Sequence, residues 1–186
     1  MKEVKGLHDV KGVPEVKEYT GAMSAARLAI VSDAPSAEAL GRDLEQDARY
    51  QGEGCGAVCT FAGIVRSTHQ NRRVKYLEYE AFAPLALKAF ARIEDEIGRE
   101  WPGTSIAIHH RVGRLEIGET SVAIAAASAH RADAFRACRY AIERVKQVAP
   151  VWKHEYFEDG DVWVEGAASD IEDEAARRQA LERACA

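Results

Sequence analysis

This sequence of 186 residues lacks several features that mark other protein classes. No apolar run approaches the roughly 18 residues of a membrane-spanning helix, so a transmembrane protein is excluded. Met1–Thr20 carries Lys and Glu throughout and has no apolar segment, so we do not expect a secretory signal. Hydrophobic residues make up 47% and charged residues 30%, which is typical of a soluble globular protein. We therefore expect a cytoplasmic protein.

Cysteine is scarce, and its spacing does not form a metal-binding motif. Cys55 and Cys59 are four residues apart, but no third and fourth ligand follow at zinc-finger spacing. His109, His110 and His130 do not form a known ligand set either. The sequence predicts no metal and no other cofactor, and it is consistent with reduced, unpaired thiols.

The features of a nucleic-acid-binding protein are also missing. The formal net charge is −5, which argues against a general nucleic-acid binder. The basic segment Arg66–Lys75 contains no aromatic residue that could stack on bases. The sequence has no phosphate-binding G-x-x-x-x-G-K-[ST] loop. We expect neither a nucleic-acid partner nor a nucleotide P-loop.

What is present is an irregular mixture of short strands and helices. We predict strands at 27–32, 57–65, 74–81, 105–112, 121–128, 151–157 and 162–165, and helices at 35–50, 85–101, 131–149 and 170–185. The strand at 57–65 is expected to be buried on both faces and to form a hairpin with 74–81, with the polar loop 67–73 at its tip. Because there is no regular β-α-β repeat, the expected class is α+β. We expect residues 1–25 to form a mobile extension, 26–170 the main domain, and 171–186 a polar C-terminal helix or tail.

Positive charge is concentrated in two segments of this acidic chain. Residues 64–75 hold four basic residues and no acid, and residues 130–153 hold six basic residues and two acids. Residues 155–174 then hold nine acids and no base. Charge runs of this kind are often solvated faces, but they also predict a local site for an anion.

A helical wheel of 131–149 places one lysine beside the apolar stripe. The stripe is predicted to contain Phe135, Cys138, Ile142, Val145 and Ala149. Lys146 lies at its margin and is expected to be at least half covered, whereas Arg144 is expected to be exposed. Such a lysine either extends its amine to solvent along apolar surface or serves as an acid, base or nucleophile.

Two further features lie at the ends of this helix. His130 and Arg131 lie where the helix begins. The free backbone N–H groups at a helix start favour the binding of a phosphate. An ordinary solvent-exposed helix cap explains the same residues equally well. After Pro150 the chain becomes extended, so Lys153 and Glu155 alternate with Trp152 and His154. Lys146 and Lys153 are therefore expected to share one corner.

Taken in order, these segments resemble the family of molybdopterin synthase large, catalytic subunits. The matching blocks are Gly56–Arg66, Leu77–Ala81, His110–Gly118, Ser128–Phe135, Cys138–Lys146, Ala149–Glu155 and Gly160–Glu165. They span about residues 27–170, so the resemblance implies that 26–170 is a catalytic domain. It also implies an α/β hammerhead-type fold with an additional antiparallel β subdomain, and a homodimer at the core of a heterotetramer.

The same resemblance implies a sulfurtransferase in molybdenum cofactor biosynthesis. The partner would be a small ubiquitin-like sulfur carrier whose C-terminal Gly-Gly thiocarboxylate enters a pocket of this chain. The substrate would be cyclic pyranopterin monophosphate, which receives two sulfur atoms to give the dithiolene of molybdopterin. Neither a nucleic acid nor a membrane is implied as a partner.

The family's functional residues can be placed on this sequence one by one. Lys146 and Lys153 match its essential lysines, with Lys153 expected as the main acid/base. The implied substrate-binding residues are Ile64, Val65, Arg66, His130, Arg131, Lys146, Lys153, His154 and Glu155.

One departure and one alternative reading accompany the resemblance. Gly166–Ala168 stands where family members often carry a basic residue, so one substrate contact is either absent or supplied by Arg72 or Arg73. The alternative is a non-enzymatic module that only binds the tail of a ubiquitin-like protein. That module would bind its partner without binding a pterin.

Overall fold

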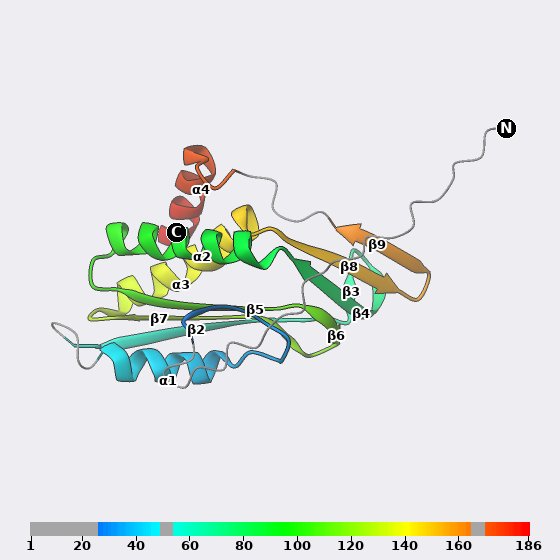
Figure 1. The fold of residues 1–186 in the computed structure, drawn as a ribbon, viewed down its shortest axis with the longest axis horizontal. Coiled ribbons are helices and arrows are strands. Elements are labelled where there is room, and N and C mark those ends of the chain that lie inside the picture. The colour runs from blue at the N-terminus through cyan, green and yellow to red at the C-terminus, as the bar shows by residue number, and fades with distance from the viewer. Residues whose placement is uncertain (1–25, 49–53, 165–169) are drawn as a thin grey trace.

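A computed structural model describes residues 26–48, 54–164 and 170–186, and it contains two sheets (Figure 1). The first sheet has the strand order β1-β5-β7-β2, formed by Leu28–Val31, Ser105–Arg111, Thr120–Ser128 and Ala57–Ile64. The β1–β5 pair is parallel, whereas β5–β7 and β7–β2 are antiparallel. The expected N-terminal extension 1–25 lies outside the described residues.

Helices cover both faces of this first sheet. Helix α1 (Ala37–Ala48) lies on one face, and helices α2 (Ala83–Glu100) and α3 (Arg131–Val148) lie on the other (Figure 1). Helix α4 (Glu174–Cys185) packs on α3, away from the sheet. Strand β7 is therefore buried along almost its whole length, as predicted for 121–128. No described helix is long and apolar enough to cross a membrane.

The second sheet is the additional antiparallel subdomain. Its strand order is β3 (Thr68–His69), β4 (Arg72–Ala81), β8 (Val151–Phe157) and β9 (Gly160–Val164). Strand β6 (Gly113–Glu116) also pairs with β4, further along that strand than β3. A small core of Val65, Val74, Leu77, Leu115 and Phe157 holds it together. The α+β class and the hammerhead-type architecture are thus confirmed. The pairing gives β8 a fixed register, with Lys153 opposite Tyr79 and Glu155 opposite Leu77.

Two expectations about the strand at 57–65 are wrong. Strand β2 pairs with β7 in the first sheet, whereas β4 belongs to the second, so the two do not form a hairpin. The actual hairpin is the short pair β3–β4. Strand β2 is also not buried on both faces: its residues alternate between half-buried and exposed, so one of its two faces is open to solvent.

The helical wheel of α3 is correct for its apolar centre and wrong at its margins. Cys138, Ile142 and Val145 are buried as expected, but the Phe135 residue is 64% exposed. Arg144, expected in solvent, is fully buried, and Lys146, expected to be half covered, is exposed. The wheel assumed one buried side, whereas α3 is covered by the sheet, by α2 and by α4.

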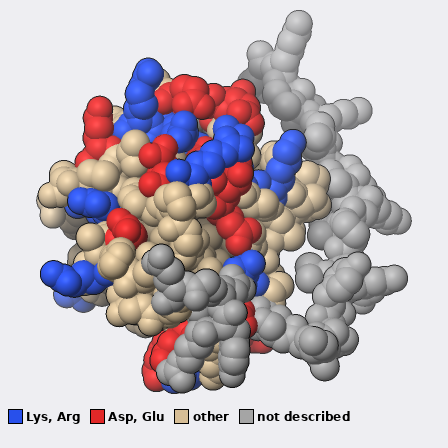
Figure 2. Space-filling view, turned by 90° about the vertical axis from the view of Figure 1, so that its left-hand side faces the viewer, with Lys and Arg blue, Asp and Glu red and all other residues tan. Residues whose placement is uncertain are grey.

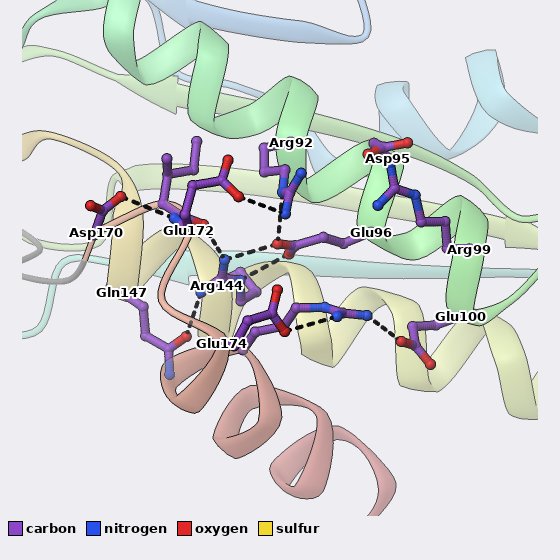
Figure 3. A network of polar contacts seen from close by, with 12 residues as sticks. Arg92, Asp95, Glu96, Arg99, Glu100, Arg144, Gln147, Asp170, Glu172 and Glu174 are labelled. Carbon is purple, nitrogen blue, oxygen red and sulfur yellow. Dashed lines mark hydrogen bonds and ion pairs between the residues drawn. The ribbon is translucent and has the colours of Figure 1, made fainter.

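The buried arginine belongs to a polar network between α2, α3 and the C-terminal segment (Figure 3). Arg144 donates to both carboxylate oxygens of Glu96 at 2.9 Å, and to the carbonyl oxygen of Ile171 at 3.2 Å. Tyr140 donates its hydroxyl hydrogen to Glu96 at 2.8 Å. Arg177 on α4 pairs with Glu100 on α2. The C-terminal segment is therefore fastened to the domain by the buried Arg144, which bonds the Ile171 carbonyl, and by the half-buried ion pair of Arg177 with Glu100.

Candidate active site

A cavity of about 500 Å³ lies where the two sheets meet, and its wall contains most of the predicted site residues. Loop and strand residues Ile64, Val65 and Arg66 form one side of it. Lys146 reaches it from the last turn of α3, and Lys153 and Glu155 reach it from β8. The turn at Ala149–Pro150 brings these two elements together. The expectation that the two lysines share one cavity is confirmed.

Glu155 is held between two donors within this cavity. Its side chain is only 3% exposed, and one carboxylate oxygen, Oε1, forms an ion pair with the Lys153 amine. The other oxygen, Oε2, lies 2.6 Å from Nδ1 of His69. Lys153 itself keeps a quarter of its side chain exposed, so its amine is both fixed and accessible.

The ionisation state of Glu155 follows from these contacts. Burial raises the pKa of the carboxyl group, but hydrogen bonds from Lys153 and His69, together with their charges, outweigh burial and leave the pKa below its ordinary value. Glu155 is therefore an anion at neutral pH. As an anion it can only accept hydrogen bonds, so the His69 Nδ1 must carry a proton.

Two cations of the cavity are not neutralised in this way. Lys146 and Arg66 are exposed, and neither has an ion-pair partner among the described residues. Among the described residues that line the cavity, Glu155 is the only acid, so this part of the wall has an excess of positive charge. Such a cavity attracts anions.

The cavity wall also contains the uncharged polar side chains of Ser121, Tyr79 and His110. Ser121 donates its hydroxyl hydrogen to the carbonyl oxygen of Gly63 at 3.1 Å. The Tyr79 and His110 rings meet edge to face with centroids 5.1 Å apart. Burial raises the pKa of Tyr79 and lowers the pKa of His110, so both rings are neutral at neutral pH.

His154 lies on the other face of β8, as the alternation of the strand predicts. It does not line the cavity; it is hydrogen-bonded to Asp161 at 2.7 Å and stacks on Trp163 with ring centroids 4.3 Å apart. Tyr156 lies against its other side, with ring centroids 4.2 Å apart. In the described chain, His154 thus belongs to an outer aromatic cluster rather than to the cavity.

His130 and Arg131 are exposed at the opposite end of α3 from Lys146. A sequence separation of 15 positions within α3 places Arg131 about 22 Å from Lys146 along the helix axis. Arg131, implied by the resemblance to bind substrate together with the two lysines, therefore does not share their cavity within a single chain. The end of the molecule where α3 begins faces the viewer in Figure 2, where basic and acidic side chains are interspersed.

Sequence reasoning missed His69. We predicted 67–73 as a polar loop, but it contains the short strand β3, which turns back through Gln70 and Asn71. Both turn residues have positive φ, 49° and 62°. That pair of residues is the one signal that could have revealed a two-residue hairpin turn. Arg72, considered as a substitute substrate contact, is already paired with Asp159 at 2.8 Å. Gly166–Ala168 lies outside the described residues.

No group of three or more His, Cys, Asp or Glu side chains in the described ranges is placed to hold a metal ion. The two lysines, Arg66 and Glu155 instead offer amines, a guanidinium and a carboxylate. These groups can bind an anion and move protons without a metal.

Comparisons with known proteins agree with the sequence resemblance. Residues 37–148 match the family described as "MoaE protein". The molybdopterin synthase catalytic subunit of Halalkalibacterium halodurans is 50% identical over 109 residues, which are 59% of this chain and 70% of that protein. The crystal structure of molybdopterin synthase from Staphylococcus aureus has a TM-score of 0.68 and 42% identity, covering 75% of this chain and 98% of that chain. A complex of subunits 1 and 2 of molybdopterin-converting factor from Helicobacter pylori, at 24% identity and a TM-score of 0.61 over 75% of this chain and 90% of that chain, shares the fold.

Proposed function

Because the chain belongs to the MoaE family, the catalytic subunits of molybdopterin synthase, we propose that its lysine cavity carries out sulfur transfer to a pterin. The substrate would be cyclic pyranopterin monophosphate, and the product would be the dithiolene of molybdopterin. The observation that carries this proposal is the presence of Lys146 and Lys153 in one cavity with uncompensated positive charge.

The charge of the cavity suits both reactants. Cyclic pyranopterin monophosphate carries a phosphate, and the carrier's tail ends in a thiocarboxylate anion. Arg66 and Lys146, which have no ion-pair partner among the described residues, would each hold one of these anions. The apolar part of the wall, including Val65 and Ile142, would exclude water around the reacting atoms.

Lys153 would act as the acid/base, and Lys146 would position the carrier's terminus. In each transfer, the thiocarboxylate sulfur forms a bond to a pterin carbon while a bond from that carbon to oxygen breaks, and the displaced oxygen leaves as water or stays on the phosphate. Water then cleaves the bond between this sulfur and the carrier's carbonyl carbon. Water supplies the oxygen that leaves the carrier as a carboxylate, so two carriers are consumed for one dithiolene. Glu155 would keep the Lys153 amine directed into the cavity.

The partner and the assembly follow from the same family. We propose a small ubiquitin-like sulfur carrier as the partner and a homodimer of this chain as the core of a heterotetramer. The Helicobacter pylori relative is a complex of two different subunits, which supports this arrangement. His130 and Arg131 remain proposed anion ligands, and they could reach a cavity only across such an interface, since they lie far from Lys146 in their own chain.

The cysteines support a reducing compartment. Cys55, Cys59, Cys138 and Cys185 are all unpaired. We therefore place the protein in the cytoplasm as part of the proposal.

Reconstitution tests the proposed function directly. Purified chain, thiocarboxylated carrier and cyclic pyranopterin monophosphate should yield a dithiolene product. Lys153→Ala and Lys146→Ala should each lower turnover by about a hundredfold or more, a range typical of a lost acid/base group. Lys88→Ala, an exposed lysine on α2, is the matched control and should be fully active. Carrier binding without any pterin conversion by the unmodified chain would instead establish the non-enzymatic binding module.

A further inference from the structure

We propose that His69 is a positioning residue for Lys153, acting through Glu155. The imidazole donates its Nδ1 hydrogen to Oε2 of Glu155, at 2.6 Å, while Oε1 receives the Lys153 amine. The three side chains thus form a chain of contacts from β3 to β8 that ends in the cavity. This inference rests on the proposed function for its catalytic consequence, but its structural part can be measured alone.

Burial of Glu155 makes the second donor necessary. Its side chain is 3% exposed with His69 in place, so in the folded protein both of its oxygens depend on protein donors. Lys153 and His69 are the donors that reach the carboxylate within the described residues. Without His69, one buried oxygen would have no partner, and the carboxylate could rotate to offer both oxygens to the amine. The Lys153 amine would then be held by both oxygens, and it would be less available and directed less well into the cavity.

The position of His69 is itself fixed from two sides. The two-residue turn at Gln70–Asn71 sets the register, with His69 opposite Arg72. Arg72 is anchored to Asp159 through three hydrogen bonds of 2.8, 3.1 and 3.3 Å, and its guanidinium lies 3.8 Å from the centre of the Phe157 ring. The short hairpin is therefore tied to the β8–β9 turn, and it presents His69 to Glu155.

The experiment compares His69→Ala with His69→Asn. The Asn amide nitrogen occupies nearly the position of Nδ1, so Asn keeps the donor and Ala removes it. We expect His69→Ala to lower kcat about tenfold with KM changed less than about twofold, since one lost hydrogen bond to a buried carboxylate has about this effect on a rate. His69→Asn should recover most of kcat. Lys75→Ala, an exposed change on the neighbouring strand, is the control and should match the unmodified chain.

A second readout does not depend on sulfur transfer. The rate at which acetic anhydride acetylates Lys153, measured by mass spectrometry against Lys88 in the same sample, reports the reactivity of the amine. We expect acetylation of Lys153 to be several-fold slower in His69→Ala, to be restored in His69→Asn, and to leave Lys88 unchanged.

The outcomes separate this inference from the proposed function. If the unmodified chain makes no dithiolene but the acetylation of Lys153 responds as described, the proposed function fails and the positioning role stands. If His69→Ala matches the unmodified chain in kcat and in Lys153 acetylation, the positioning role is overturned. Equal losses in His69→Ala and His69→Asn, accompanied by equal losses of melting temperature, would also overturn it, because the imidazole would then act only in packing.

Discussion

Arg144 and Glu96 form a two-point ion pair that solvent does not reach: their side chains are 0% and 1% exposed, and both hydrogen bonds are 2.9 Å long. The pair joins α3 to α2 beneath the C-terminal segment. Each charge lost its hydration on folding. The two charges compensate each other, and Glu96 also accepts from Tyr140 while Arg144 also donates to the Ile171 carbonyl oxygen.

Breaking this pair should strongly destabilise the fold. Arg144→Met leaves the Glu96 carboxylate buried without its main partner, which should lower the free energy of unfolding by about 3–5 kcal/mol. Chemical denaturation measures the loss. Arg144→Met combined with Glu96→Leu leaves no unpaired charge and should be less destabilised than Arg144→Met alone. Losses that simply add in the double variant would contradict this account.

Stability should decline at acid pH. Burial raises the pKa of Glu96, but hydrogen bonds from Arg144 and Tyr140 outweigh it, so the pKa in the folded protein lies below the ordinary value of 4.5. Glu155 shows the same direction. A depressed pKa contributes stability above the unfolded value, and that contribution is lost as pH falls from 4.5 through the folded pKa.

Thermal melting between pH 7 and pH 3 measures this decline. Near neutral pH, the ionisation of Glu96 and Glu155 should not affect the melting temperature. At pH values below about 4.5, the melting temperature should decrease. Glu96→Gln should flatten the acid limb, whereas Glu182→Gln, an exposed control on α4, should leave it intact. If the melting temperature of Glu96→Gln decreased at acid pH as steeply as that of the unmodified chain, Glu96 would not be the source of the decline.

The cavity wall should not tolerate a side chain at Gly63. An added Cβ would lie 2.7 Å from Cγ1 of Val122, a contact too short without movement of that buried, β-branched side chain. Gly63→Ala should lower the free energy of unfolding by about 1–3 kcal/mol, the usual cost of overpacking. Adding Val122→Ala should remove much of that cost, so a double-mutant cycle should show a coupling. Independent effects at the two positions would refute the predicted clash.

Replacing two other glycines by alanine should change the free energy of unfolding in opposite directions. Gly98 lies in α2 with nothing within 4 Å of an added Cβ, so Gly98→Ala should raise the free energy of unfolding by about 0.5–1 kcal/mol. Gly103 also has open space around it, but its φ of 79° disfavours any side chain, so Gly103→Ala should be destabilising. Denaturation of both variants checks the pair, and effects of the same sign would contradict the prediction.

Local sequence patterns predicted the helices and strands better than they predicted which strands pair with each other. Pro150 and the alternation after it correctly placed Lys153 and Glu155 on one face of β8 and His154 on the other, because alternation depends only on the strand itself. The pairing of β2 with β7 depends on which distant segments meet, and nothing in the apolar run at 57–65 encodes that choice.

The candidate site shows the same division. Lys146 shares a cavity with Lys153 as predicted, but the predicted exposures of Lys146 and Arg144 were both wrong. For Arg144 the reason is that a helical wheel does not show that α4 covers a second side of α3. His69 could not be found from its own segment. Its role arises from a contact with Glu155, which lies 86 positions further along the chain.

The alternation of β8 also makes the site sensitive to a change in length. Inserting or deleting one residue between Pro150 and Lys153 would reverse which side chains face each way. The amine and the carboxylate would then point outward, and an imidazole and an indole would enter in their place. A substitution at Val151 or Trp152 leaves this alternation in place, whereas a change in the number of residues does not.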